Sequence, residues 1–175
     1  MKTKAQVWVE TVIYTLIGLS IIAAILAIIT PKIQETKDKA IIDQSLDILD
    51  SLSRNIDEIK FSPGNSWPVQ IKFDKGKFVV DGVNDQVYFL FEDSKVKYSQ
   101  EGGEIVRGRI HIMTTKVNRN TVVKLSLNYT AVLNITYQDN DKVQTFQSAA
   151  LPYDLFVEHK GKNAGSGLTQ INFNS

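Results

Sequence analysis

The sequence predicts an α+β protein in which a long N-terminal helix, transmembrane and then amphipathic, precedes an antiparallel β-sandwich-like domain. One observation behind this is an apolar run, Thr11–Pro31, that carries no charge. The other is a hydrophobic period that changes from three or four residues to two near Trp67, as expected where a helix gives way to strands. A length of 175 residues leaves room for one anchor and one domain of ordinary size.

Composition excludes several classes of function. The formal net charge is +1, so the chain lacks the basic excess that nucleic-acid binding needs, and we expect no nucleic-acid partner. Without cysteine there is no disulfide, no thiolate metal site and no cysteine nucleophile. The core must therefore be held together by packing alone.

The apolar run has the length of a membrane span. At ~1.5 Å per residue it reaches roughly 30 Å, whereas a secretory h-region has only about 7 to 15 residues, and no A-x-A cleavage pattern follows it. Lys2 and Lys4 precede the run without any acid, while mixed charges follow it, which favours a cytoplasmic amino terminus. We therefore expect the chain in the cell membrane, with its C-terminal domain outside the cell.

Glu10 does not fit a plain anchor, because a carboxylate at the edge of an apolar helix is costly unless it finds a partner or reaches the interface. A cut after Ala5 would expose an α-amino group one helical turn before Glu10. The alternative is an interfacial carboxylate that reaches water at the helix end. Both interpretations remain open on the residues alone.

The residues around this cut carry a family resemblance. A basic residue (Lys4), a small residue (Ala5), Gln6 and then Glu10 at the head of an apolar helix resemble the class III signal peptide of type IV prepilins, of the archaeal type IV pilin-like sort. The resemblance implies that residues 1–5 are a leader, which a prepilin peptidase removes between Ala5 and Gln6. It also implies that Glu10 neutralises the terminal amine of a neighbouring pilin subunit, and that pilus assembly machinery builds the mature chain into a surface filament.

The helix is expected in two parts, residues 6–30 as the transmembrane or filament-core part and residues 31–61 as an amphipathic continuation. In the second part apolar residues recur at steps of three and four: Ile42, Leu46, Leu49, Leu52, Ile56 and Ile59. Pro31 should kink the helix between the two parts. In the first part Gly18 and Ser20 would allow helices of neighbouring subunits to approach closely. A coiled-coil or linker stalk is the alternative for the second part.

The resemblance covers the leader and the helix, while the β domain shows only a general likeness to archaeal pilin and flagellin-type ectodomains. Pro31 departs from the uninterrupted helix of flagellin-type subunits. That departure favours an adhesive filament over a motility filament.

Residues 62–175 are expected to form the β-rich extracellular domain. Strands are predicted, after one that starts near Trp67, at these positions: Lys77–Asp81, Gln86–Glu92, Lys95–Gln100, Glu104–Met113, Thr121–Gln138, Lys142–Gln147, Leu151–Glu158 and Leu168–Phe173. Gln86–Glu92 is apolar on both phases, so we expect a central strand covered on both faces. Many short strands separated by turns indicate an antiparallel sandwich or barrel.

The segment Val123–Tyr137 alternates most clearly, with apolar or small residues at its odd positions. Its even positions include Asn128 and Asn134, each the start of an Asn-x-Thr glycosylation triplet, and the alternation places both on the outward face. The segment is long for one strand, so it should bend at a bulge or divide near Thr130.

Within Glu104–Met113 the residues Arg107, Arg109 and His111 share one phase and would form a short basic ladder. It is either a solvated sheet face or a docking strip for an acidic neighbour or surface polymer. Asp139-Asn140-Asp141 begins like a calcium loop but lacks its glycine and distant glutamate, so we expect a hairpin turn.

Catalysis finds little support. His111 and His159 are the only histidines, and neither lies in a recognisable nucleophile or metal motif. We expect no catalytic residues, no metal and no cofactor, and we interpret the chain as a structural subunit rather than an enzyme. The alternative function is a monomeric membrane-tethered module whose extracellular domain binds sugar or a surface polymer.

Overall fold

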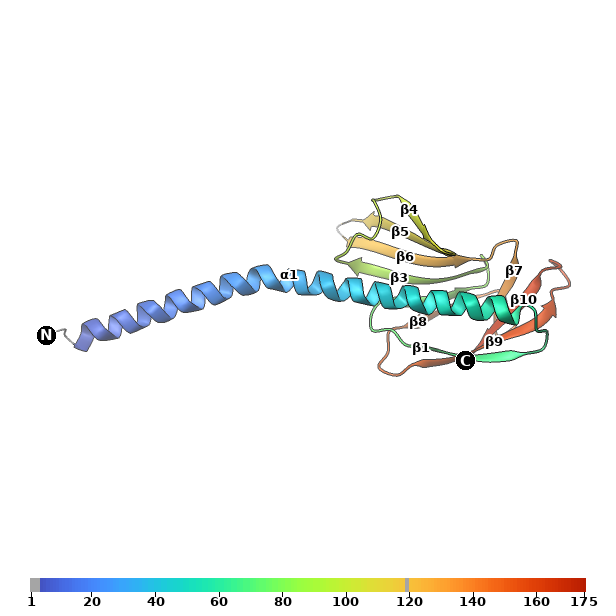
Figure 1. Ribbon diagram of the computed structural model, residues 1–175, viewed down its shortest axis with the longest axis horizontal. Helices are drawn as coiled ribbons and strands as arrows, with labels where there is room; N and C mark the ends of the chain where they lie inside the picture. The colour runs from blue at the N-terminus through green and yellow to red at the C-terminus, as the bar shows by residue number, and fades with distance from the viewer. Residues whose placement is uncertain (1–3, 119) are drawn as a thin grey trace. The chain divides into compact units, whose positions relative to one another are not determined.

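The computed structural model describes residues 4–118 and 120–175, with side chains from Val7 onward. It has an α+β fold in which one long helix, α1 (Lys4–Ile59), precedes β-sheets whose strand pairs are mainly antiparallel (Figure 1). The strands are these: β1 (Ser66–Ile71), β2 (Lys77–Asp81), β3 (Gln86–Ser94), β4 (Glu104–Arg107), β5 (Ile110–Val117), β6 (Asn120–Asn128), β7 (Leu133–Tyr137), β8 (Val143–Gln147), β9 (Tyr153–Lys162) and β10 (Thr169–Asn174). The chain divides into two compact units, Met1–Lys37 and Asp38–Ser175.

The first unit holds the N-terminal part of α1. Among the described residues this is a helix long and apolar enough to cross a membrane, by length and composition, and none of its apolar window is buried within the chain. Helical structure continues through Pro31 without interruption. The bend expected there stays a prediction.

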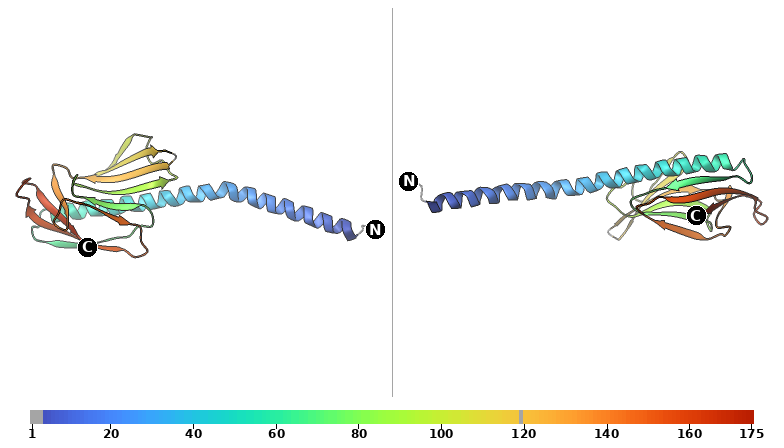
Figure 2. Two further views of the ribbon diagram at one scale, coloured as in Figure 1. Left: turned by 180° about the vertical axis from the view of Figure 1, so that it is seen from behind. Right: turned by 90° about the horizontal axis from the view of Figure 1, so that it is seen from below.

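The second unit contains the C-terminal half of α1 and both sheets. In the described residues one sheet has the order β1-β9-β10-β7 and the other the order β4-β5-β6-β3-β2-β8. The helix half runs alongside the strands, as the views in Figures 1 and 2 agree. The apolar residues predicted for its inner face are 0–1 % exposed and belong to the same core as the inner residues of both sheets.

Aromatic side chains join the two sheets inside this core. The ring of Phe146 on β8 lies 5.9 Å from that of Tyr137 on β7 and 5.0 Å from that of Tyr153 on β9. Phe146 also lies 6.0 Å from Phe78 on β2. Because β8 and β2 belong to one sheet and β7 and β9 to the other, these contacts confirm a sandwich-like arrangement.

Several strand predictions need correction. The segment Lys95–Gln100 is not a strand. Glu104–Met113 is not one strand, because it divides into β4 and β5 around a two-residue loop, Gly108-Arg109. Gly108 has a φ of 62°, a conformation that glycine adopts without the strain of a side chain, so the chain reverses there.

The prediction for the third strand was half right. β3 lies between β2 and β6, with Val87, Phe89 and Phe91 0–1 % exposed on its inner face. Its outer face, with Tyr88 and Leu90, is only half-buried, so the expected burial on both faces is wrong.

The segment Val123–Tyr137 divides near Thr130, as expected, but its halves join different sheets. β6 lies in the six-stranded sheet, and β7 pairs in parallel with β10 in the four-stranded sheet. The sandwich is therefore not wholly antiparallel. Ala131, expected on the inner face, is exposed and has a φ of 62° in the connection between the two strands.

Candidate functional site: the exposed helix half and the domain surface

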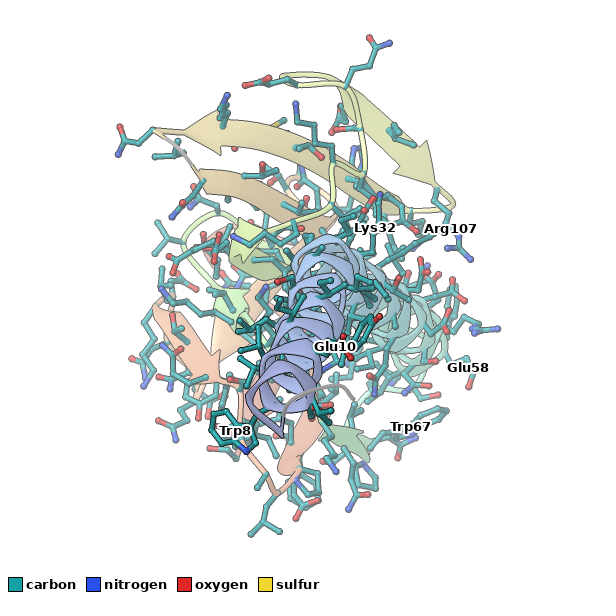
Figure 3. All side chains as sticks on the ribbon, turned by 90° about the vertical axis from the view of Figure 1, so that its left-hand side faces the viewer. Trp8, Glu10, Lys32, Glu58, Trp67 and Arg107 are labelled. Atoms are coloured by element: carbon teal, nitrogen blue, oxygen red, sulfur yellow. The ribbon has the colours of Figure 1, made fainter. Side chains whose placement is uncertain are left out.

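The N-terminal half of α1 presents apolar side chains on all its sides. Large apolar residues from Val7 to Ile33 are 42–75 % exposed, with Trp8 the most exposed among them. Figure 3 shows Trp8 pointing away from the helix axis, with Glu10 on the same stretch of helix. A helix that is apolar all round belongs in lipid or in the core of a bundle rather than in water.

Four hydroxyl groups in this half form hydrogen bonds within the helix. The hydroxyls of Thr11, Thr15, Ser20 and Thr30 each donate to the carbonyl oxygen four residues earlier, at 2.7–2.9 Å. Such internal bonds remove the need for water around these hydroxyls, which suits a helix surrounded by apolar groups.

The predicted assembly residues lie in this half. Glu10 is half-buried, and Ser20 uses its hydroxyl to bond the carbonyl oxygen of Leu16 at 2.7 Å. A Cβ built on Gly18 would meet nothing within 4 Å among the described residues, so this side of the helix is open to a neighbouring surface. The leader residues before Lys4 lie outside the described residues; Lys4, Ala5 and Gln6 begin α1, and their side chains also lie outside the description.

The C-terminal half of α1 is fixed to the β domain by polar contacts as well as by its core residues. The carboxylate of Asp38, 7 % exposed, accepts a hydrogen bond from the Lys75 ammonium at 2.7 Å and another from the backbone N–H of Lys95 at 2.7 Å. Asp43 accepts a hydrogen bond from the hydroxyl of Tyr98. Burial and the Asp43 carboxylate together raise the pKa of the Tyr98 hydroxyl.

Asp57 forms a further connection near the end of the helix. Its Oδ1 lies 2.7 Å from Lys60 Nζ and 2.7 Å from Arg109 Nη1. Partial burial works against ionisation, but Lys60 and Arg109 outweigh it and hold the pKa of the Asp57 carboxyl below its usual value.

The predicted basic ladder does not exist as one surface. Val106 opposes His111 and Arg107 opposes Ile110 in the β4–β5 hairpin, so Arg107 and His111 lie on opposite faces of the sheet. Arg109 lies in the turn and binds Asp57, while His111 Nδ1 lies 2.8 Å from Glu104 Oε1. Arg107 is exposed at the end of β4 and projects from the domain surface (Figure 3). The sequence signal for this turn was Gly108, which lies between the apolar residues of β4 and those of β5.

The two glycosylation triplets also have different environments. Asn128 is exposed at the end of β6, as predicted. Asn134 is only 9 % exposed inside β7, so its expected place on the outward face is wrong. Its Nδ2 donates to Asp141 Oδ1 at 3.4 Å, and Thr136, 1 % exposed, donates to Asn172 Oδ1 at 3.0 Å. Polar residues of the neighbouring strand β10 and of the turn after β7 thus cover the face of β7 that the alternating sequence pattern predicts to be exposed.

The acidic turn after β7 is tight, as expected. Tyr137 and Asn140 exchange backbone hydrogen bonds at 3.0 and 3.2 Å, with Gln138 and Asp139 at positive φ. It connects strands of different sheets rather than a hairpin of one sheet. Within residues 4–118 and 120–175, no group of three or more histidine and acidic side chains is arranged to hold a metal ion.

No protein-family model matches the chain, and no curated protein and no solved structure matches it.

Proposed function

We propose that the chain is a structural subunit of an archaeal type IV pilus-like surface filament. The observation that carries the proposal is the contrast within α1. Its first half is apolar on every side and exposed, whereas its second half buries one apolar face in the β domain. The first half therefore needs an apolar environment from outside its own chain, which lipid supplies before assembly and neighbouring copies supply afterwards.

Assembly would be driven by helix packing rather than by a hydrophobic gain, because lipid and the core of a helix bundle are equally apolar. Gly18 leaves room for a neighbouring helix along its side of α1. Glu10 would enter this apolar core, where a carboxylate is costly unless it is paired. Removal of the five-residue leader would expose the α-amino group of Gln6, and Glu10 would pair with this group on a neighbouring subunit.

In this arrangement the β domain decorates the outside of the filament and is displayed for adhesion or another surface interaction. The partners would be the membrane, other copies of the chain, a prepilin peptidase and the assembly machinery. The activity we propose is assembly and not catalysis. Asp38 and the buried face of Ile42 to Ile59 hold the domain on its own helix, so that each copy carries its domain into the filament.

The proposal is tested by the amino terminus of the chain in its native membranes. Intact mass and N-terminal peptide mapping should find Gln6 as the first residue, with the apolar helix retained. A chain that begins at Met1 would contradict filament assembly through a processed terminus. It would favour the monomeric tethered binding module instead.

A further inference from the structure

The two Asn-x-Thr triplets lie six residues apart in sequence, yet the fold separates their environments. Asn128 ends β6 and is exposed, and the third residue of its triplet, Thr130, is exposed as well. Asn134 lies within β7, where every residue is buried. A modifying enzyme must reach both the asparagine and the threonine of its triplet, and only the first triplet offers them in the folded domain.

The side chain of Asn128 is held in a defined turn. Its Oδ1 accepts two hydrogen bonds from Thr130, one from the backbone N–H at 3.0 Å and one from the hydroxyl at 2.7 Å. The same hydroxyl lies 2.8 Å from the carbonyl oxygen of Asn84, a second acceptor for its one proton, so Thr130 lies against the connection between β2 and β3. Both bonds fall on the carbonyl oxygen of Asn128, and its Nδ2 donates to no residue within the described part of the chain. Because Asn128 is exposed and its oxygen is the bonded end of the side chain, its amide nitrogen is the end left for a bond to a sugar.

The surface beside Asn128 has room for a sugar. A hollow of about 330 Å³ is bordered by Asn128, Arg109, His111 and Val132. Its volume falls at the lower end of the roughly 300–1,000 Å³ of small-molecule sites. Val132, 63 % exposed, offers an apolar edge, and Arg109 and His111 offer hydrogen-bonding groups. A sugar ring has an apolar face that could contact Val132 and hydroxyl groups that could bond to Arg109 and His111.

We propose that Asn128 is a site of N-linked glycosylation and that Asn134 is not. The co-substrate would be a saccharide joined through C1 to a lipid-linked phosphate or pyrophosphate. A bond forms between Asn128 Nδ2 and C1, the bond between C1 and the phosphate oxygen breaks, and that oxygen leaves with the electron pair. A base of the transferase takes the proton that Nδ2 loses. The inference requires an exported β domain and so rests on the proposed function.

Asn134 cannot be glycosylated in the folded domain without local unfolding. Its Nδ2 is engaged by Asp141, and the hydroxyl of Thr136 is engaged by Asn172. Positions 133 to 137 also pair in parallel with β10 over their whole length. To reach a transferase, β7 would have to leave both its sheet and the core.

The test is peptide mapping by mass spectrometry of the full chain purified from its native host. The peptide with Asn128 should carry a saccharide, and the peptide with Asn134 should be unmodified. Asn128→Gln and Thr130→Ala should each remove the saccharide, whereas Thr130→Ser, which keeps the hydroxyl, should retain it. Asn134→Gln is the matched control and should leave the saccharide in place.

An unmodified Asn128, or a saccharide on Asn134, overturns the inference. So does a saccharide on Asn128 that survives Thr130→Ala. The amino terminus measured in the same sample reports separately on the proposed function. A chain that begins at Gln6 and is bare at Asn128 contradicts glycosylation alone, whereas an intact Met1 terminus contradicts the filament.

Discussion

The two halves of helix α1 contain the same kinds of apolar residue but place them differently. From Val7 to Ile33 they lie on all sides of the helix and are exposed. In the second half six of them form one face that is 0–1 % exposed: Ile42, Leu46, Leu49, Leu52, Ile56 and Ile59. The second half also carries the acids that bind the β domain, Asp38, Asp43 and Asp57. The distribution of apolar residues around a helix, more than their number, thus separates a segment that serves its own domain from one that needs another environment.

The largest effect should come from a cavity in the packed half. Leu49 is 0 % exposed, and Leu49→Ala should lower the free energy of unfolding of the β domain by about 2–5 kcal/mol, through lost burial and an unfilled cavity. Denaturant unfolding of the full chain in detergent, followed by near-UV circular dichroism, measures this.

The matched control is Leu19→Ala in the exposed half, where the side chain is 58 % exposed. It should change the same free energy by less than about 0.5 kcal/mol. Equal losses from the two variants would remove the distinction between the halves.

A smaller effect is expected at Asp38, where the packed half begins. Asp38→Ala removes one of the two acceptors of Lys75, the other being the carbonyl oxygen of Asp93, and leaves the backbone N–H of Lys95 without its acceptor, at a cost of about 1–3 kcal/mol. Thermal unfolding of the full chain measures the loss. Glu35→Ala is the control, because its ion pair with Lys32 is exposed and contributes little. A similar loss in both variants would contradict the role given to Asp38.

The smallest effect is expected at Asp57, whose contribution to the free energy of unfolding depends on pH. Because its pKa is lowered in the folded state, the ionised carboxylate stabilises the fold above the ordinary value of 3.8, and this stabilisation is lost as pH falls through the lower folded value. Asp57→Asn should therefore cost less than about 1 kcal/mol at pH 7, since the site is partly exposed. The difference from the unaltered chain should disappear in acid, as urea unfolding at several pH values would show.

At Asp85 the pKa shift, and with it the effect of pH on stability, has the opposite sign to that at Asp57. Burial, with Asp141 and Asp81 nearby, raises its pKa, so its charge disfavours the fold above that raised value and the penalty is relieved as pH falls through it. Asp85→Asn keeps an oxygen for the backbone N–H of Ile135 and should stabilise the chain slightly at pH 7. If both asparagine variants shift stability in the same direction, the assignment of charges at these two sites is wrong.

Regular patterns in the sequence predicted most of the fold. The buried face from Ile42 to Ile59 followed from its helical period, and β2 (Lys77–Asp81) was placed at its observed bounds. The strand predicted at Lys95–Gln100 does not form, because side chains distant in sequence accept hydrogen bonds from its backbone N–H groups. Asp38 binds the N–H of Lys95, and Thr114 Oγ1 binds that of Ser99. No local pattern encodes such partners.

The surface sites were harder to predict for a related reason. Asn134 alternates like an outward residue, but Asp141 and the parallel strand β10 cover it. Arg109 shares a phase with His111 in the sequence, yet the turn at Gly108 puts it beside Asp57. Alternation tells which residues share a face of one strand, and it does not tell where a strand ends or what covers its polar side.

In the proposed filament the exposed half of α1 packs against other copies through a paired Glu10. The most direct measurement is electron microscopy of sheared surface filaments, with peptide identification of this chain, from cells that carry Glu10→Gln and from cells that carry the control Glu35→Gln. We predict that Glu10→Gln abolishes or sharply reduces the filaments, while Glu35→Gln leaves them at normal number and length. Normal filaments of this chain in the Glu10→Gln cells would contradict the proposed pairing of Glu10 in assembly.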